Sequence, residues 1–133
     1  MKQEGPFFNS SIGMKAVMAV TGLVLVGFVL GHMAGNLQIY LPAHDGVNAL
    51  DTYAVFLRTM LHGAGVWIAR AVLLVSTALH IWSAIRLTKM NADARPVAYQ
   101  KPEYKASTLA SRTMRLSGFI LAAFIVFHLL HLT

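Results

Sequence analysis

Residues 16–35 read AVMAVTGLVLVGFVLGHMAG, an uncharged apolar run that is long enough to cross a lipid bilayer as one helix. Such a span needs about 20 apolar residues at a rise of about 1.5 Å per residue. Two further apolar runs follow at about 65–85 and 114–132, and each contains one Arg near its start, from where a long side chain can reach the interface. The sequence therefore predicts an all-α integral membrane fold, in which residues 1–133 form a single domain with three transmembrane helices and antiparallel neighbours.

The composition of the whole chain agrees with a membrane protein. Of its 133 residues, 56% are hydrophobic and 12% are charged, whereas roughly 25% are charged in ordinary soluble domains. The net charge of +6 comes mostly from short basic stretches beside apolar segments, so nucleic acid is not an expected partner. The chain has no Cys, which excludes disulfides and cysteine-held iron–sulfur clusters within it.

Lys and Arg are distributed unequally between the connections that join the predicted spans. The connection 86–115 holds seven of them, whereas 36–64 holds only Arg58. By the positive-inside rule the basic connection is cytoplasmic. The N-terminus, with Lys2 and Lys15, lies two spans away and is then also cytoplasmic.

The two connections have different expected structures. In the outer connection, apolar residues recur with helical spacing after Asn48, which together with Asp51 resembles a capped helix start. We therefore expect a short interfacial helix at about 49–60. The inner connection contains Pro96 and Pro102, and we expect an ordered but irregular loop that can dock a soluble partner.

Each predicted span carries a histidine within or near its apolar run: His32, His80 and His128, spaced by 48 residues. An ionisable group in hydrocarbon costs a few kcal/mol on insertion scales, so an intramembrane histidine suggests a functional site. For any one of them, a neutral ring that is hydrogen-bonded to a neighbouring helix is an open alternative. Three together favour haem iron, because one imidazole nitrogen can ligate while the other is held by a local hydrogen bond.

Depth in the membrane decides which histidines can share an iron. At about 1.5 Å per residue, His32 lies about 26 Å and His128 about 20 to 24 Å from the basic residues at the cytoplasmic ends of their spans. By the same rise His80 lies only about 9 Å from Arg86, and so about 15 Å in depth from the other two. The sequence predicts an outer haem held by His32 and His128, and an inner level at which His80 lacks a partner from this chain.

The other histidines have simpler expected roles. His44 is expected to be solvated in the outer connection, and His62 to lie in a loop or at the interface. His131 follows His128 by one turn and can face the same side of its helix, but the regular spacing favours His128 as the ligand.

A row of glycines, Gly27, Gly31 and Gly35, stands at four-residue spacing on the first predicted helix. It predicts close helix packing of the GxxxG kind, or a smooth strip on which a flat macrocycle approaches the backbone beside His32. The two interpretations are compatible.

Several motifs occur together in an order that is typical of one family. They are SSIGMK at 10–15 with TG at 21–22, GHMAGN at 31–36, LHIWSA at 79–84, and SRTMRLSG at 111–118 with FH at 127–128. With these motifs the chain resembles the cytochrome b membrane anchor subunit of succinate dehydrogenases and fumarate reductases, and more narrowly the bacterial two-haem, single-anchor type. The similarity covers nearly the whole chain.

The resemblance implies an electron-carrying subunit in the bacterial inner membrane. A flavoprotein subunit and an iron–sulfur subunit are then expected on its cytoplasmic face, where succinate is oxidised or fumarate reduced. Electrons pass between them and a membrane quinone, with menaquinone expected, through haem b, of which the full subunit holds one or two. The resemblance pairs His32 with His128 at the distal haem and makes His80 one ligand of the proximal haem.

The number of spans departs from the family pattern. Members of this type have five spans, whereas three are predicted here. We therefore expect that the chain is a fragment of the subunit, or that the remaining membrane helices of a larger haem-binding bundle come from a separate polypeptide.

Contacts to quinone and haem propionates are less determined. Ser11 and Lys15, at the cytoplasmic start of the first helix, are candidates to bind a quinone carbonyl or a propionate, and helix capping and interface anchoring are the alternatives. Arg112 and Arg115 are candidates to pair with propionates, with topogenic charge as the alternative.

Other functions stay open on sequence alone. Asp51 and Tyr53 near the outer surface are candidates to handle the protons of a distal quinol. The whole chain can instead be a haem-free structural anchor with a quinone site, or another di-haem b-type membrane cytochrome. A small transporter is disfavoured because the spans lack acidic residues and the helix-breaking Pro pairs expected at midplane sites.

Overall fold

The computed structural model describes residues 7–95, 97 and 107–132, and in these residues it contains helices and no strand. The elements are η1 (Phe7–Asn9), α1 (Ser11–Asn36), η2 (Leu37–Tyr40), α2 (Ala49–Thr59), η3 (Met60–Gly63), α3 (Ala64–Asp93) and α4 (Leu109–Leu132). Within this part of the chain, three helical stretches are long and apolar enough to cross a membrane. The predicted all-α fold with three spanning helices is confirmed.

The chain divides into two compact units, residues 1–96 and 97–133. The first contains α1 to α3 and the second contains α4, so each is described by itself. The expectation of a single domain stays a prediction.

Each predicted span lies inside a longer helix. α1 begins at Ser11 and so includes Lys15, while α3 continues beyond the predicted end of the second span to Asp93. Arg86 therefore lies on α3 and not in the connection. The rest of the expected irregular loop, with Pro96, Pro102, Lys101 and Lys105, falls mostly outside the residues that the structure describes.

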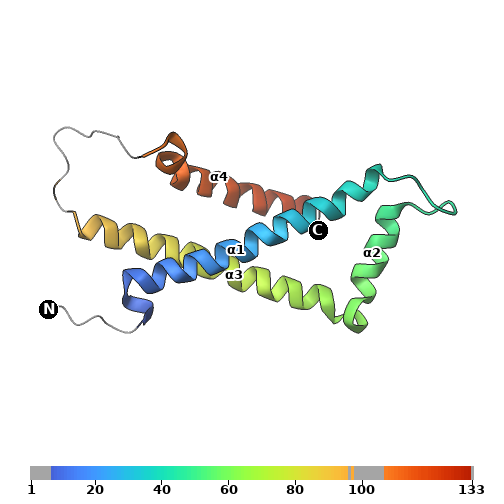
Figure 1. The fold of residues 1–133 in the computed structure, drawn as a ribbon, viewed down its shortest axis with the longest axis horizontal. Helices are drawn as coiled ribbons and strands as arrows, with labels where there is room; N and C mark the ends of the chain where they lie inside the picture. Colours follow the sequence, from blue (N-terminus) through green and yellow to red (C-terminus); the bar gives the residue numbers. More distant parts are fainter. Residues whose placement is uncertain (1–6, 96, 98–106, 133) are drawn as a thin grey trace. The chain divides into compact units, whose positions relative to one another are not determined.

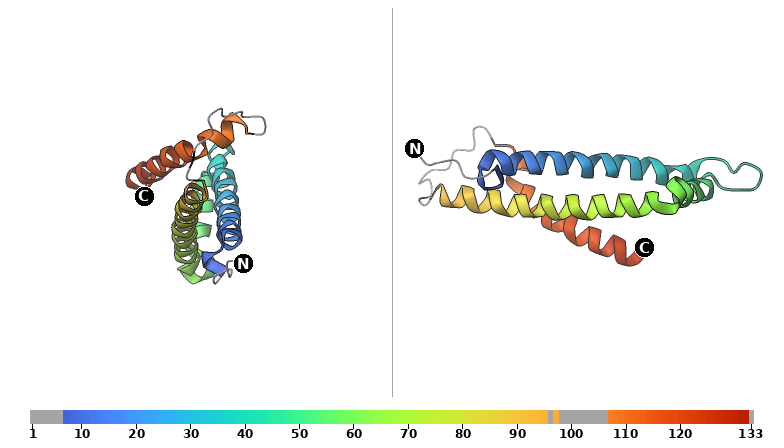
Figure 2. Two further views of the ribbon diagram at one scale, coloured as in Figure 1. Left: turned by 90° about the vertical axis from the view of Figure 1, so that its left-hand side faces the viewer. Right: turned by 90° about the horizontal axis from the view of Figure 1, so that it is seen from below.

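α1 and α3 pack side by side over most of their length (Figures 1 and 2). Buried residues recur at seven-residue spacing on both helices: Met14 and Thr21 on α1, and Ser76 and Ser83 on α3. A seven-residue repeat keeps one seam facing the partner helix. The small Ser and Thr side chains allow the two backbones to approach closely, which is typical of helix pairs in membranes.

The start of α1 and the end of α3 share one end of this antiparallel pair. Arg86 Nη2 donates a hydrogen bond of 3.2 Å to Asn9 Oδ1, just before α1 begins. Ser10 caps the helix, because its Oγ accepts from the Gly13 N–H over 3.0 Å and donates to the Phe7 carbonyl over 3.0 Å. The basic residues of the two helix termini therefore gather at the same end.

α2 lies at the opposite end of the α1/α3 pair (Figure 1). Its N-cap residue is Asn48, as predicted, but the Asn48 amide donates to Asp51 Oδ2 over 3.5 Å and makes no bond to a backbone N–H. Tyr53 packs on Gly35 of α1, where an added Cβ would lie 2.6 Å from Tyr53 Cε1. The short helix predicted at 49–60 is present, and its location at a membrane surface stays a prediction.

A tight reverse turn precedes α2. Asp45 and Gly46 have φ values of 51° and 77°, and on either side of them His44 and Val47 exchange two backbone hydrogen bonds of 3.0 Å. Positive φ at both central residues is the geometry that favours Asp-Gly in a two-residue hairpin turn. The sequence interpretation did not include this turn, although the Asp-Gly dipeptide is its usual signal.

Candidate functional site

His80 joins α3 to α1 through its ring. Its Nδ1 lies 3.0 Å from Thr21 Oγ1, and a Cβ added to Gly22 would lie 3.3 Å from its Cε1. Thr21 is only 6% exposed, so the contact lies within the packed seam. α1 therefore fixes one side of the His80 ring. A hydrogen bond to a neighbouring helix is also what is expected of a membrane histidine that binds no cofactor.

His32 lies on an exposed part of α1 and is held by its own helix. Its ring stacks on Phe28, with ring centroids 5.2 Å apart and planes at 16°. Asn36 Nδ2 lies 3.2 Å from His32 Nε2 and donates to the His32 carbonyl over 3.0 Å. Because an amide NH₂ group only donates, Nε2 is the acceptor and carries the lone pair of the ring. Iron ligation through Nε2 would require the Asn36 amide to turn away, which costs about 1 kcal/mol for one hydrogen bond.

The glycine row on α1 has two kinds of surroundings. A Cβ added to Gly27 or Gly31 would meet no atom within 4 Å in the described part of the chain, whereas one added to Gly35 would collide with Tyr53. Helix packing therefore explains Gly35. Gly27 and Gly31 leave an open strip on the helix that carries His32, which is the feature that the macrocycle interpretation requires.

His32 and His80 lie at different levels of the α1/α3 pair. His80 contacts Thr21, which precedes His32 by about three turns, or about 16 Å at about 1.5 Å per residue. This agrees with the depth difference of about 15 Å that the basic flanks predicted. Two axial nitrogens on one iron are roughly 4 Å apart at metal–imidazole bonds near 2 Å. These two histidines therefore cannot share an iron.

α4 carries its two histidines near its C-terminal end, and both stack on a phenylalanine one turn before. The ring centroids are 5.6 Å apart for Phe124 and His128, and 5.4 Å apart for Phe127 and His131. This is the same spacing of aromatic ring and histidine that α1 shows. Since both α4 histidines share the arrangement, the preference for His128 as the ligand stays a prediction.

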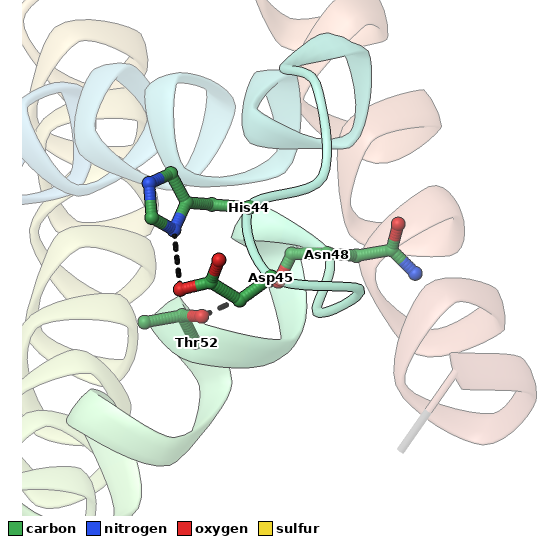
Figure 3. A network of polar contacts seen from close by, with 4 residues as sticks. All are labelled: His44, Asp45, Asn48 and Thr52. Carbon is green, nitrogen blue, oxygen red and sulfur yellow. Dashed lines mark hydrogen bonds and ion pairs between the residues drawn. The ribbon is translucent and has the colours of Figure 1, made fainter.

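The two histidines between α1 and α3, His44 and His62, have ordinary surroundings. His44 Nδ1 lies 3.0 Å from Asp45 Oδ2, with the two side chains 93% and 88% exposed, and Thr52 Oγ1 donates to the Asn48 carbonyl over 3.4 Å (Figure 3). A contact between two side chains this exposed agrees with the solvated role expected for His44. His62 has a φ of 55° in the turn between α2 and α3, which agrees with the loop role expected for it.

The candidate quinone and propionate residues occur as two pairs. Ser11 and Lys15 are exposed and lie one turn apart on one face of α1. Ser11 does not cap this helix, because Ser10 does. Arg112 and Arg115 lie three residues apart near the start of α4. The two pairs belong to different units, and the quinone or propionate contacts expected of each pair stay predictions.

Asp51 and Tyr53, the candidates for a distal quinol, are not brought to one site. Tyr53 lines an open groove of about 480 Å³ together with Gln38, His44 and Thr52, and Asp51 is not among the lining residues. Residues two apart on a helix of 3.6 residues per turn point about 200° apart. A proton route through both side chains therefore has no geometric support from α2 itself.

Sequence reasoning gave no individual role to Thr21, Asn36 or Arg86. Thr21 is the one hydroxyl residue in the run 16–35, and Asn36 follows His32 by one turn, so each carried a weak signal. Arg86 was treated as a topogenic charge only, but its Nε is buried and has no hydrogen-bond partner among the residues described. Its contact with Asn9 depends on the packing of α1 against α3, which the sequence alone does not define.

Comparisons of the chain with models of protein families, with curated proteins and with solved structures found no match.

Within the described ranges, no group of three or more His, Cys, Asp or Glu side chains is placed to hold a metal ion. A haem iron instead takes one imidazole from each of two facing helices.

Proposed function

We propose that the chain is a haem b membrane anchor of a bacterial succinate:quinone oxidoreductase. It transfers electrons between the flavoprotein and iron–sulfur subunits on the cytoplasmic face and a quinone in the membrane, in the direction of succinate oxidation or of fumarate reduction. The observation that carries the proposal is the pair His32 and His80, which lie on two packed apolar helices. Along the axis of α1 they are about 16 Å apart. Two levels of imidazole are what two stacked haems require.

The surroundings of both histidines suit haem iron. His80 has an Nδ1 hydrogen bond to Thr21, the kind of local bond that orients metal-ligating imidazoles. His32 stands on the helix that carries the open strip at Gly27 and Gly31. In the proposal, His32 and His128 hold the outer haem, and His80 holds the inner haem with a second ligand from the remaining membrane helices. Haem b supplies one-electron transfer, and two axial imidazoles leave no open position for oxygen chemistry.

The same proposal assigns the basic end of the α1/α3 pair to the soluble subunits. Ser11 and Lys15 lie at this end and would hydrogen-bond a quinone carbonyl or a propionate, with menaquinone as the proposed quinone. Arg112 and Arg115 would pair with propionates, because a guanidinium presents several N–H donors to a carboxylate.

A haem-free anchor is the second candidate function, and one observation favours it. His32 and His80 both have hydrogen-bond partners within the α1/α3 pair, Asn36 and Thr21, without any cofactor. A purely structural role for these histidines would leave the chain to bind quinone and partner subunits only.

Purification of the assembled complex from the native membrane separates the two functions. We expect a flavoprotein and an iron–sulfur protein to co-purify with the chain, succinate to reduce an added quinone, and the dithionite-reduced spectrum to show a narrow α band of bis-histidine haem. An intact complex with quinone reductase activity but no haem band would establish the haem-free anchor. A haem-bearing complex without a flavoprotein would instead favour another b-type membrane cytochrome.

The proposed orientation can be tested with single cysteines, because the chain contains no Cys. We expect His44→Cys, in the outer connection, to react with a membrane-impermeant maleimide added to intact cells. We expect Ser107→Cys, before α4, to react only after permeabilisation, because the basic connection 86–115 is placed inside. The reverse labelling pattern would overturn the orientation and, with it, the assignment of the cytoplasmic face.

A further inference from the structure

The contact between Thr21 and His80 is a side-chain hydrogen bond that joins α1 to α3, and it lies inside their seam. Thr21 Oγ1 has three polar neighbours: the Val17 carbonyl at 2.7 Å, the Met18 carbonyl at 3.2 Å and His80 Nδ1 at 3.0 Å. Two of these are acceptors that the helix itself supplies. The direction of the third bond therefore follows from counting protons.

A threonine hydroxyl has one proton to donate and two lone pairs to accept with. The Val17 carbonyl is the nearest acceptor, and the Met18 carbonyl lies beside it on the same helix, so we assign the hydroxyl proton to the bond with these carbonyls. Oγ1 then presents a lone pair to His80 Nδ1, which must carry a hydrogen for the contact to be a bond. In a neutral imidazole only one nitrogen is protonated, so the lone pair of the His80 ring is on Nε2.

We propose that Thr21 is a positioning residue for His80, whose hydroxyl accepts the Nδ1 proton and thereby holds the ring in the tautomer that offers Nε2 to haem iron. For the ligand itself the inference rests on the proposed function, whereas the tautomer does not depend on it. A metal-ligating histidine usually donates its other ring N–H to a local acceptor, which fixes the ring orientation and raises the basicity of the ligating nitrogen. Thr21 supplies that acceptor from the neighbouring helix.

Gly22 restricts the ring from the same side. A Cβ at this position would lie 3.3 Å from His80 Cε1, tighter than ordinary van der Waals contact, so the ring would have to move by a few tenths of an ångström. Thr21 and Gly22 thus set the position of the ring together, one by a hydrogen bond and one by the absence of a side chain.

The test replaces the hydroxyl without changing the shape of the side chain. Thr21→Val removes the acceptor, and Thr21→Ser keeps it. Thr113→Val is the matched control, because Thr113 Oγ1 donates to its own helix in the same way, to the Leu109 carbonyl over 3.0 Å and the Ala110 carbonyl over 3.4 Å. The histidines of α4 lie at least about four turns further along the helix.

The first measurement is the ¹⁵N spectrum of His80 in the haem-free chain in detergent micelles, at a pH at which the ring is neutral. We expect a protonated Nδ1 and an unprotonated Nε2 in the wild type, in Thr21→Ser and in Thr113→Val, and a mixture of tautomers in Thr21→Val. A wild-type ring protonated on Nε2, or a tautomer that Thr21→Val leaves unchanged, would overturn the proposal.

The second measurement is the midpoint potential of the inner haem in the assembled complex. Loss of the bond to Nδ1 makes Nε2 a weaker donor and disfavours ferric iron, so Thr21→Val should shift the potential upward, while Thr21→Ser and Thr113→Val should not. A tenfold change in the relative binding of ferric and ferrous iron corresponds to about 59 mV for one electron. The two failures are distinguishable. If the tautomers behave as expected in a complex without haem, the proposed function falls and the hydrogen bond stands; if haem is present and its potential does not move in Thr21→Val, Thr21 is not a positioning residue.

Discussion

Replacing His32 or His128 by alanine is expected to abolish one of two b-type haem signals in the assembled complex and to leave the other in place. Each replacement removes one of the two proposed axial ligands of the outer haem. The inner haem would keep its proposed ligand His80, which contacts α1 at Thr21, about 16 Å from His32 at about 1.5 Å per residue. Reduced-minus-oxidised spectra recorded during a redox titration resolve the two components, and one of them should be missing.

Two further variants make this result specific. His80→Ala should remove the complementary component, and His131→Ala, which alters a ring stacked on Phe127 in the same way as His128 on Phe124, should leave both. Loss of both components from a stably assembled His32→Ala complex would contradict separate haem sites. A His131→Ala variant that lacks the outer component would move the ligand from His128 to His131.

The existence of the helices followed from the length of the apolar runs, but their ends did not. A run of apolar residues stops at the first charges, whereas a helix stops where its hydrogen bonding is interrupted. Residues 86–93 contain no Gly or Pro, so α3 continues through them to Asp93 despite its polar side chains. At the same end of the pair, α1 begins early because Ser10 caps it.

The surroundings of the histidines were predictable only where they are local. His32 meets Phe28 and Asn36 one turn away on the same helix, and helical spacing alone places these residues together. His80 meets Thr21, which is 59 residues distant in sequence. That contact depends on the register and rotation of two packed helices. A sequence pattern predicts how deep each residue lies in the membrane, but not which residues of the two helices face each other.

The α1/α3 seam that sets this register should fail when Ser83 is enlarged. Ser83 is completely buried and donates a hydrogen bond of 2.9 Å from Oγ to the His80 carbonyl. We expect Ser83→Leu to force the helices apart at a cost of about 1 to 3 kcal/mol, as overpacking of a well-packed site does. Lipid tails solvate an exposed Leu as well as a protein neighbour does, so in a membrane nothing drives the enlarged pair back together.

Thermal unfolding of the purified protein in detergent, together with the inner haem signal, measures this effect. Ser83→Leu should lower the melting temperature and weaken the inner haem component, because the Thr21–His80 bond opens with the seam. Ser83→Ala should change both only slightly, since it leaves a small residue at the contact. Ala78→Leu is the matched control: it places the same side chain on an exposed position of α3, where lipid accommodates it. If Ser83→Leu melts at the temperature of Ala78→Leu, the small residues are not what holds α1 against α3, and the position of His80 does not depend on them.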